Sequence, residues 1–325
     1  MLILSEPDLR QLLPMEELIA AMADALAAFS SGGVQQPLRT VLEVGTSKAF
    51  FGVMPAFIPA SGALGTKLVT VFGSNLALGL PSHLATIILL DSTTGEMRGL
   101  LDGRYITEAR TAAVSAVSTQ LLARPAASTL AIIGTGVQAW SHLEALRLVR
   151  KLSEIRVWSP TAAHRARFAS EAEEKLSVHV TPTASAREAV EGADLIALVS
   201  SSREPVVHSA WVQDGAHVCA VGACRPDQRE MDSDLVGRAR LFVDSRTAAL
   251  AEAGDIVLPI KEGRFTAGHI AGELGEVVSG RTPGRKNSSE VTIFKSLGMA
   301  VEDVAAAHLA FEKAESRGLG RGILI

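Results

Sequence analysis

From residue 128 onward the chain alternates short apolar runs with helical stretches, and this alternation is the strongest constraint on its fold. The apolar runs are "STLAIIG", "EIRVWS", "VHVTP", "DLIALVS", "AHVCAVG" and "RLFVDS". Helical stretches such as 137–150 and 161–175 lie between most of them. Such alternation is typical of a parallel sheet with crossover helices. We therefore predict an α/β domain in this part of the chain.

The first of these runs leads directly into a glycine motif and a helix. Gly134, Thr135, Gly136 and Ala139 form a GxGxxA pattern within "LAIIGTGVQAWSHLEAL". In this context Gly134 permits the tight turn, Gly136 lets the backbone approach a pyrophosphate, and Ala139 keeps helix and strand close. The helix N-terminus offers N–H donors and a positive dipole to the phosphates. We predict a Rossmann dinucleotide-binding domain.

The residues after the second strand bear on which dinucleotide is bound. The segment "VWSPTAAHR" contains no carboxylate to accept hydrogen bonds from a ribose 2′-hydroxyl. Ser159 and Thr161 offer hydroxyls there, and His164 and Arg165 offer positive charge. These groups suit the 2′-phosphate of NADPH, which we predict to be preferred, with NADH as the other possibility. The alternative is that they form only a turn and a helix cap.

The part of the chain before residue 128 mixes helices with short strands. "MEELIAAMADALAAFS" (15–30) has helical spacing, and "TEARTAAVSAVSTQLLA" (107–123) predicts a second helix capped by Thr107. The C-terminal stretch from 291 begins as a strand, ends as a long helix, and is predicted to return to the first domain. We thus predict a discontinuous α+β domain, 1–122 with 302–325, and a Rossmann domain, 123–301. Extended segments are predicted at 39–44, 49–55, 64–72 and 84–91.

Three cations in the first part are candidates for binding an anionic substrate. Lys67 lies inside "LGTKLVTVF", where an unpaired buried lysine would be costly. Arg110 falls in the first turn of the predicted helix, an unfavourable place for a cation unless it faces an anion. Arg39 lies at a strand start. Arginines suit bidentate carboxylate binding, and a desolvated lysine can act as a proton donor. The alternative for each is a surface or ion-paired role.

Composition narrows the classes of partner. The net charge of −4, from 31 basic and 35 acidic residues, gives no reason to expect nucleic acid or an acidic membrane. The longest apolar runs, such as 84–90, are too short for a membrane span, and the N-terminus does not resemble a signal peptide. Two cysteines, Cys219 and Cys224, supply neither a disulfide framework nor a zinc site. We expect a cytoplasmic protein without a metal.

Ten stretches that span nearly the whole chain carry one further signal: "GGVQQPLRTV", "FFGVMPAF", "TKLVTVF", "LPSHLATIILL", "LDGRYITEARTAAVSA", "IIGTGVQAWSHLEAL", "VGACRPDQREMD", "FVDSRTAALAEAGD", "ELGEV" and "TIFKSLGMAVED". Taken together, they resemble the ornithine cyclodeaminase/mu-crystallin family. This resemblance implies a Rossmann domain beside a discontinuous substrate and dimerisation domain, and hence a homodimer. It also implies hydride transfer between a nicotinamide and the α-carbon of a small amino or imino acid.

The resemblance also implies roles for individual residues. Arg39, Lys67 and Arg110 would hold the substrate carboxylate, and Lys67 would also give or take a proton. Arg110 would be catalytic as well. Ser82 and His83 would line the nicotinamide pocket, where His83 would also meet the substrate; from the residues alone His83 could equally be structural. Further cofactor positions are implied, with Arg110 and Arg165 beside them: Val137, Gln138, Ser159, Thr161, Ser200, Val221 and Ser296.

Two departures from the cyclodeaminase members separate the family's activities. Gly52 stands where cyclodeaminases carry a glutamate, and Cys224, on the substrate side, stands where they carry an aspartate. Without these acids nothing obvious recognises the side-chain ammonium of ornithine. We therefore predict a ketimine reductase that converts 1-pyrroline-2-carboxylate or 1-piperideine-2-carboxylate to L-proline or L-pipecolate. The alternatives are an amino-acid dehydrogenase or reductive aminase acting on an acyclic keto acid, an ornithine cyclodeaminase, and a non-enzymatic ligand carrier.

Overall fold

The computed structural model describes residues 1–45 and 49–324. Within it the chain forms two compact units, Met1–Thr111 with Gly298–Ile325, and Ala112–Leu297. The chain passes from the first unit to the second inside helix α3 (Gly103–Leu122). The domain limits that the sequence suggests, 1–122 with 302–325 and 123–301, remain a prediction of where independently folding domains end.

The first unit contains a sheet in the strand order β15-β1-β6-β5-β4-β3-β2. Strands β2 to β6 pair antiparallel with their neighbours, and β1 pairs parallel with β6. The elements are β1 (Leu2–Leu4), α1 (Glu6–Leu12), α2 (Met15–Ser30), β2 (Thr40–Val44), β3 (Ala49–Ile58), β4 (Ala63–Val71), η1 (Gly73–Leu78), β5 (His83–Leu90), β6 (Met97–Asp102), α11 (Ala300–Arg317) and β15 (Arg321–Gly322).

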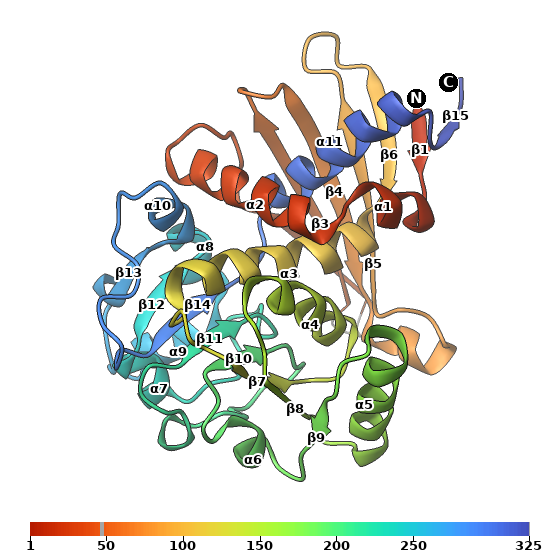
Figure 1. Ribbon diagram of the computed structural model, residues 1–325. Helices are drawn as coiled ribbons and strands as arrows, with labels where there is room; N and C mark the ends of the chain where they lie inside the picture. The colour runs from red at the N-terminus through yellow and green to blue at the C-terminus, as the bar shows by residue number, and fades with distance from the viewer. Residues whose placement is uncertain (46–48, 325) are drawn as a thin grey trace. The chain divides into compact units, whose positions relative to one another are not determined.

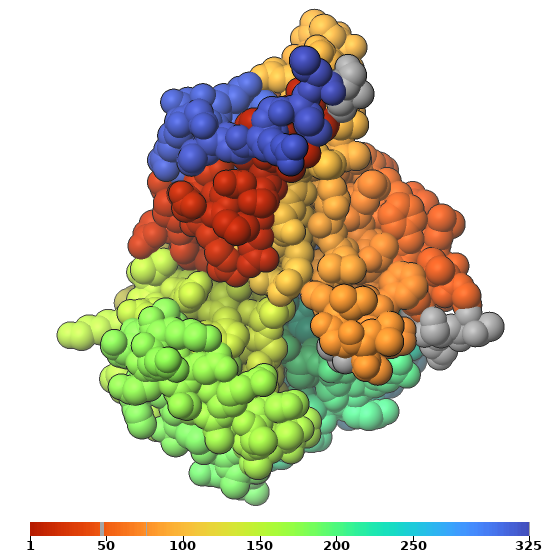
Figure 2. Space-filling model, turned by 90° about the vertical axis from the view of Figure 1, so that its right-hand side faces the viewer, coloured from red at the N-terminus to blue at the C-terminus, as the bar shows by residue number. Residues whose placement is uncertain are grey.

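Helices α2 and α11 cover one face of this sheet, as Figure 1 shows. The N-terminal helices and α11 also lie side by side at the surface (Figure 2). Burial alternates along β4, so that Gly65, Lys67 and Val69 face inward and their neighbours are half-buried. A Cβ on Gly65 would lie 3.4 Å from the side chain of Val304 on α11, which places this inward face against that helix. The predicted helix over 15–30 is confirmed as α2.

Helix α3 begins four residues before the predicted start at 107. Its cap is Asp102, whose carboxylate accepts a hydrogen bond from the backbone N–H of Tyr105 at 2.8 Å. The prediction that Thr107 caps the helix is therefore wrong, and Thr107 instead donates to the carbonyl of Gly103 at 2.7 Å. Arg110 consequently lies beyond the first turn of α3. The helix dipole acts mainly on the first turn, so it gives no reason to expect an anion beside Arg110.

The second unit is built on an eight-stranded sheet in the order β13-β12-β14-β11-β10-β7-β8-β9. Every pair in it is parallel, which confirms the predicted α/β fold class. The elements are β7 (Thr129–Ile133), α4 (Val137–Val149), β8 (Glu154–Trp158), α5 (Ala162–Leu176), β9 (Thr181–Pro182), α6 (Ala186–Val190), β10 (Leu195–Leu198), η2 (Ser209–Trp211), β11 (His217–Ala220), α7 (Ser233–Arg238), β12 (Arg240–Val243), α8 (Arg246–Glu252), α9 (Gly254–Lys261), η3 (Ala267–His269), β13 (Ile270–Glu273), α10 (Leu274–Val278) and β14 (Thr292–Lys295).

Helices pack on both faces of this sheet, each over its own apolar core. On β7, Leu130 and Ile132 join a core formed with α4 and α5, whereas Ala131 and Ile133 join a core formed with α6 to α9. Successive strand residues point to opposite faces, so a strand covered on both sides must be apolar throughout. This double burial explains why the strands of the second unit read as short continuous apolar runs.

Part of the interior of the second unit is polar. Ser115 of α3 hydrogen-bonds Nε2 of His142 at 2.9 Å, and Ser118 hydrogen-bonds Nε2 of His217 at 3.1 Å. The opposite nitrogen of His217 lies 2.9 Å from the hydroxyl of Thr292. Burial lowers the pKa of His142 to about 4 and that of His217 to about 3. Both rings are therefore neutral at physiological pH. Among the helices that the structure describes, none is both long and apolar enough to span a membrane.

Candidate active site

A buried lysine lies at the centre of the first unit. The side chain of Lys67 on β4 is 2% exposed, and its Nζ lies 2.5 Å from Oδ2 of Asp303 on α11. Nζ also donates to the hydroxyl of Thr107 on α3 at 3.3 Å. Lys67 points inward because it shares the β4 face that α11 covers. The strand, the last long helix and α3 thus each contribute one group to the same buried point.

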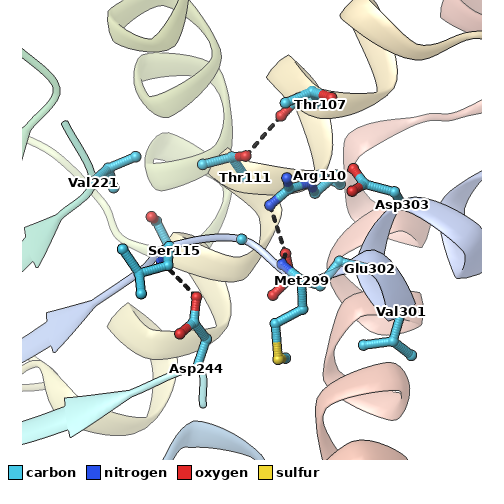
Figure 3. Close-up of polar contacts among 12 residues, drawn as sticks. Thr107, Arg110, Thr111, Ser115, Val221, Asp244, Met299, Val301, Glu302 and Asp303 are labelled. Carbon is cyan, nitrogen blue, oxygen red and sulfur yellow. Dashed lines mark hydrogen bonds and ion pairs between the residues drawn. The ribbon is translucent and has the colours of Figure 1, made fainter. Parts of the chain in front are cut away.

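Arg110 joins the same network from α3 (Figure 3). Its Nε lies 2.8 Å from Oδ1 of Asp303, and its Nη1 lies 2.6 Å from Oε2 of Glu302. Both carboxylates are fully buried. Oε2 of Glu302 also accepts the backbone N–H of Met299 at 3.1 Å, at the start of α11. Glu302 therefore holds Arg110 and the first turn of α11 together.

Arg39 reaches the same region from the segment before β2. Its Nη2 donates to the carbonyl of Gly298 at 3.4 Å. A Cβ on Gly298 would lie 2.5 Å from Nη1 of Arg110, so only glycine leaves room for that guanidinium. The structure thus brings Arg39, Lys67 and Arg110, the three cations selected from the sequence, into one cluster.

The cluster perturbs the titration of its members. Burial lowers the pKa of Lys67 to about 8, against the opposing effect of the Asp303 charge. Burial alone would raise the pKa of Asp303, but the charges of Arg110 and Lys67 hold it below its usual value. Burial, followed by the charges of Lys67 and Arg110, lowers the pKa of His83 to about 4. His83 is therefore neutral at pH 7, and Lys67 can exchange a proton near neutrality.

The charges of the cluster suit an anionic ligand. Arg39, Lys67 and Arg110 supply three positive charges, and Glu302 and Asp303 supply two negative charges, so the formal sum is 3 − 2 = +1. One carboxylate on a ligand would balance this sum. A guanidinium and an ammonium together provide the donors that such a group accepts.

The glycine motif of the second unit has the geometry of a dinucleotide site. Gly134 has φ of +127°, and a Cβ there would lie 2.7 Å from the carbonyl oxygen of Val199. A Cβ on Gly136 would meet nothing within 4 Å, so the backbone beside it is open to a ligand. Gly136 is the N-cap of α4, where helix N–H groups favour a phosphate. Oε1 of Gln138, in the first turn, is buried without a hydrogen-bond partner among the described residues.

The remaining predicted coenzyme residues lie at the carboxyl edge of the same sheet, where ligands of such folds bind. Ser159 follows β8, Ser200 follows β10, Val221 follows β11 and Ser296 follows β14. The hydroxyl of Ser296 is buried and has no hydrogen-bond partner within the described part of the chain. These residues and the open glycine turn fit a dinucleotide. Val137 is half exposed at the start of α4, and Thr135 lies in the turn before it.

After β8, the guanidinium of Arg165 donates to the carbonyl of Ser159 at 2.5 Å, and Thr161 is the N-cap of α5. Cys224 follows β11; it is exposed, and its thiol donates to the carbonyl of Val221 at 3.3 Å. Ser82 and His83 belong to the first unit with the cation cluster, whereas Cys224 belongs to the second.

The sequence predictions missed Glu302 and Asp303, the two buried carboxylates of the cluster. Both stand in "MAVEDVAAAHLAF", where adjacent acids are followed by a run of alanines on a helix that must bury one face. An acidic pair in such an apolar setting, together with a lysine inside a buried strand, was the available signal. Opposite buried charges need one another as partners.

Known proteins resemble this chain both in sequence and in fold. The sequence model of the "Ornithine cyclodeaminase/mu-crystallin family" matches residues 1–318. The ketimine reductase mu-crystallin of Mus musculus is 45% identical over 298 residues, which is 91% of each chain. The structure of Thermococcus litoralis Delta(1)-pyrroline-2-carboxylate reductase in complex with NADH and L-proline superposes with a TM-score of 0.97, at 41% identity, over 99% of this chain and 100% of that one. An archaeal alanine dehydrogenase dimer with bound NAD gives a TM-score of 0.94, at 32% identity, over 99% of this chain and 98% of that one.

Proposed function

The chain belongs to the ornithine cyclodeaminase/mu-crystallin family, and from that premise we propose that it reduces the C=N bond of a cyclic ketimine carboxylate. The prediction of a nicotinamide-dependent oxidoreductase is confirmed by relatives that include a ketimine reductase, a pyrroline-2-carboxylate reductase and an alanine dehydrogenase. The proposed substrates are 1-pyrroline-2-carboxylate and 1-piperideine-2-carboxylate, which would yield L-proline and L-pipecolate.

The observation that carries this proposal is the buried ion cluster around Lys67. Its surplus positive charge binds the substrate carboxylate through Arg39, Lys67 and Arg110. Lys67, with a pKa of about 8, is protonated at pH 7 and donates its proton to the imine nitrogen. Once the imine nitrogen is protonated, the imine carbon is a much better hydride acceptor than it is in the neutral imine. Asp303 keeps the ammonium charged despite its burial, because the negative charge opposes desolvation.

The coenzyme that the second unit binds is a nicotinamide dinucleotide, which supplies the hydride when bound. The residues that would hold it are the glycine turn with Val137 and Gln138, and the residues after β10, β11 and β14: Ser200, Val221 and Ser296. We propose NADPH as the preferred form, because no carboxylate follows β8 and Arg165 lies beside Ser159 there. An Arg165→Ala variant would then lower kcat/KM for NADPH more than for NADH.

The inward face of β3 supports reduction over cyclodeamination. Gly52 pairs with Val69 in the sheet, and a Cβ on Gly52 would lie 3.0 Å from the side chain of Val69, two residues from Lys67. A glutamate at position 52 would place its carboxylate on the Lys67 face, where it could bind the side-chain ammonium of a diamino acid such as ornithine. Glycine offers no such group, and Cys224 offers none in the second unit.

Steady-state assays test the proposed function directly. Purified protein is given 1-pyrroline-2-carboxylate or 1-piperideine-2-carboxylate with NADPH and, separately, with NADH, and coenzyme oxidation is followed at 340 nm. Pyruvate with methylamine tests the acyclic alternative. L-ornithine with NAD⁺ tests cyclodeamination, which is followed by ammonia release because that reaction consumes no net coenzyme. Faster turnover of the cyclic imines supports the proposal. Oxidation of neither coenzyme with either imine would overturn it.

We also propose a homodimer, through the sheet face that α2 and α11 leave uncovered. This face carries half-buried apolar side chains in register across three strands, and Leu42 on β2, 59% exposed, extends it opposite Phe51. Leu42→Glu should convert the dimer to a monomer in light scattering after gel filtration. Val41→Glu is the control, because Val41 points to the other face and is 48% exposed. A dimeric Leu42→Glu variant would remove this face from the interface. The apolar residues are Phe51, Val53, Pro55, Phe57, Leu64, Leu68, Ile88 and Leu90.

A further inference from the structure

One buried carboxylate in the second unit ties together the ends of two neighbouring strands. Glu230 is fully buried. Its Oε1 accepts hydrogen bonds from the backbone N–H and the hydroxyl of Ser200, both at 2.7 Å, and its Oε2 accepts the N–H of Gly222, also at 2.7 Å. Ser200 follows β10 and Gly222 follows β11, and these strands are paired. A single side chain thus fixes the chain as it leaves both strands.

These strand ends adjoin the glycine turn. The chain goes from β7 to β8 and β9 on one side of the sheet, and then returns to β10 on the other side of β7. Ligands of doubly wound sheets bind at such a reversal, beyond the carboxyl ends of the strands. The carbonyl of Val199 lies 2.7 Å from where a Cβ of Gly134 would be, so the glycine turn packs directly on the residue before Ser200.

Glu230 is itself anchored by a buried ion pair. Oδ1 of Asp255 accepts the backbone N–H groups of Glu230 at 2.8 Å and of Met231 at 3.1 Å. Oδ2 of Asp255 lies 3.1 Å from Nζ of Lys295, and both side chains are 0% exposed. Because leaving either charge without the other would be costly, the pair holds Glu230 in place. The loops above have little freedom of their own, since a Cβ on Gly222 would lie 2.0 Å from the carbonyl of Ser200.

We propose that Glu230 is a positioning residue for the coenzyme site, because its carboxylate fixes Ser200 and Gly222 where the dinucleotide binds. It acts through those residues and does not touch the coenzyme. The proposal rests on the proposed function, since it requires that the second unit bind a nicotinamide coenzyme.

The first test compares Glu230→Gln with the unmodified protein. A glutamine amide nitrogen is a donor, so one of the donors of Ser200 or Gly222 would face another donor. Binding of NADPH and NADH is measured by nucleotide fluorescence, with KM for coenzyme and for 1-pyrroline-2-carboxylate. We expect the coenzyme Kd to rise about tenfold, as for one lost charge-assisted hydrogen bond. The imine KM should change less than about twofold. A coenzyme Kd within twofold of the unmodified value would overturn the proposal.

Asp194→Asn is the matched control. Oδ2 of Asp194 accepts the backbone N–H groups of Ser128 at 2.9 Å and Thr129 at 3.2 Å, at the amino end of β7 and so at the opposite edge of the same sheet. This variant should lower Tm and leave the coenzyme Kd unchanged. Equal weakening by both variants would mean a general loss of structure and would defeat the proposal. Unmodified protein that binds neither coenzyme would instead contradict the proposed function.

A second variant keeps the test informative if Glu230→Gln does not fold. Ser200→Ala removes one hydrogen bond to Oε1 and leaves the backbone bond in place. We expect its coenzyme Kd to rise about fivefold. Where Glu230→Gln does fold, a double-mutant cycle is also possible. The double variant Glu230→Gln/Ser200→Ala should then bind coenzyme hardly more weakly than the single variant with the higher Kd, because both substitutions act through one contact. Additive effects, or an unchanged Kd for Ser200→Ala, would contradict the positioning role.

The pH dependence of binding provides an independent readout. Burial raises the pKa of Glu230 to about 7, opposed by Lys295 on β14 and supported by Asp255 on α9. Cys224 is the other titratable group near Lys295. Protonated Glu230 has an O–H where it now only accepts, so NADH affinity should fall as pH drops through about 7. Glu230→Gln should bind NADH with no such step. The same step in that variant would assign it to another group and count against the proposal.

Discussion

Lys67 and Asp303 form a buried ion pair, with Nζ and Oδ2 2.5 Å apart and side chains 2% and 0% exposed. Neither charge has water to solvate it, so each depends on the other for its ionisation. Arg110 shares the same carboxylate from the other side. The pair therefore sets both the stability of the first unit and the protonation of its lysine, and the two effects can be measured separately.

Replacing Asp303 by asparagine should act on both. Loss of a partner in a buried pair costs about 3–5 kcal/mol of unfolding free energy. Because the Asp303 charge raises the pKa of Lys67, its removal should move the lysine's titration about one pH unit or more below 8. Urea denaturation and the pH profile of kcat/KM measure these effects. Glu315→Gln, which breaks an exposed pair with Arg98, is the control and should leave the pH profile unchanged.

The pH dependence of turnover should have opposite signs in the two directions. Imine reduction needs protonated Lys67, so at saturating coenzyme kcat/KM for the imine should be level below about pH 8 and fall above it. Oxidation of L-proline needs Lys67 in its neutral form, which can accept the proton, so the oxidation rate should rise as pH increases to about 8. Rate profiles in both directions check this, with Lys67→Met as the variant that should abolish both limbs. Limbs of the same sign in both directions would exclude Lys67 as the proton carrier.

Alanine at the two glycines of the turn should have different effects: one substitution should lower stability and the other should weaken coenzyme binding. Gly134→Ala places a Cβ 2.7 Å from the Val199 carbonyl at a φ of +127°, which should lower the unfolding free energy by about 1–3 kcal/mol. Gly136→Ala meets nothing within 4 Å, so stability should hold while the coenzyme Kd rises about tenfold or more, because the methyl group blocks the pyrophosphate. Thermal melts with and without NADH distinguish the two; equal stability of both variants would be inconsistent with this geometry.

Acid should destabilise the second unit through its buried histidines. The folded-state pKa values of His142 and His217, about 4 and about 3, lie below the ordinary value of 6.5. The unfolded chain thus binds more protons, and stability present above pH 6.5 is lost as pH falls toward 4, by roughly 3 kcal/mol per histidine. Unfolding free energies of His142→Gln and His217→Gln between pH 7 and 4 should fall less steeply than those of the unmodified protein. His179→Gln, whose side chain is 85% exposed, should match the unmodified slope.

The Rossmann part of the fold was accessible from the sequence because its signals are local. Strands buried on both faces appear as apolar runs, and Gly134 and Gly136 lie between one such strand and a helix. The start of α3 was misplaced because its cap, Asp102, also ends β6, a strand that the sequence predictions did not include. Local patterns do not show which of two adjoining elements a capping residue serves.

Only the cations of the ion cluster could be predicted from the sequence, for a different reason. Lys67 stood out because a cation in a buried strand needs a partner, but nothing near it in the sequence supplies one. Its partner lies on α11, after the whole of the second unit. Periodicity and spacing describe neighbours along the chain, whereas Asp303 meets Lys67 only when the sheet and the last long helix have packed together.

The position of α11 in the sequence also determines when the first unit can be completed during synthesis. Strands β3 to β5 leave the ribosome long before residue 303, and until then their inner face lacks α11 and the counter-charge that Asp303 supplies to Lys67. The second unit, continuous from Ala112 to Leu297, can fold in that interval as domains generally do on a growing chain. Until α11 emerges, the nascent first unit exposes apolar strand surface, the feature that makes incompletely folded chains prone to aggregation and to capture by chaperones.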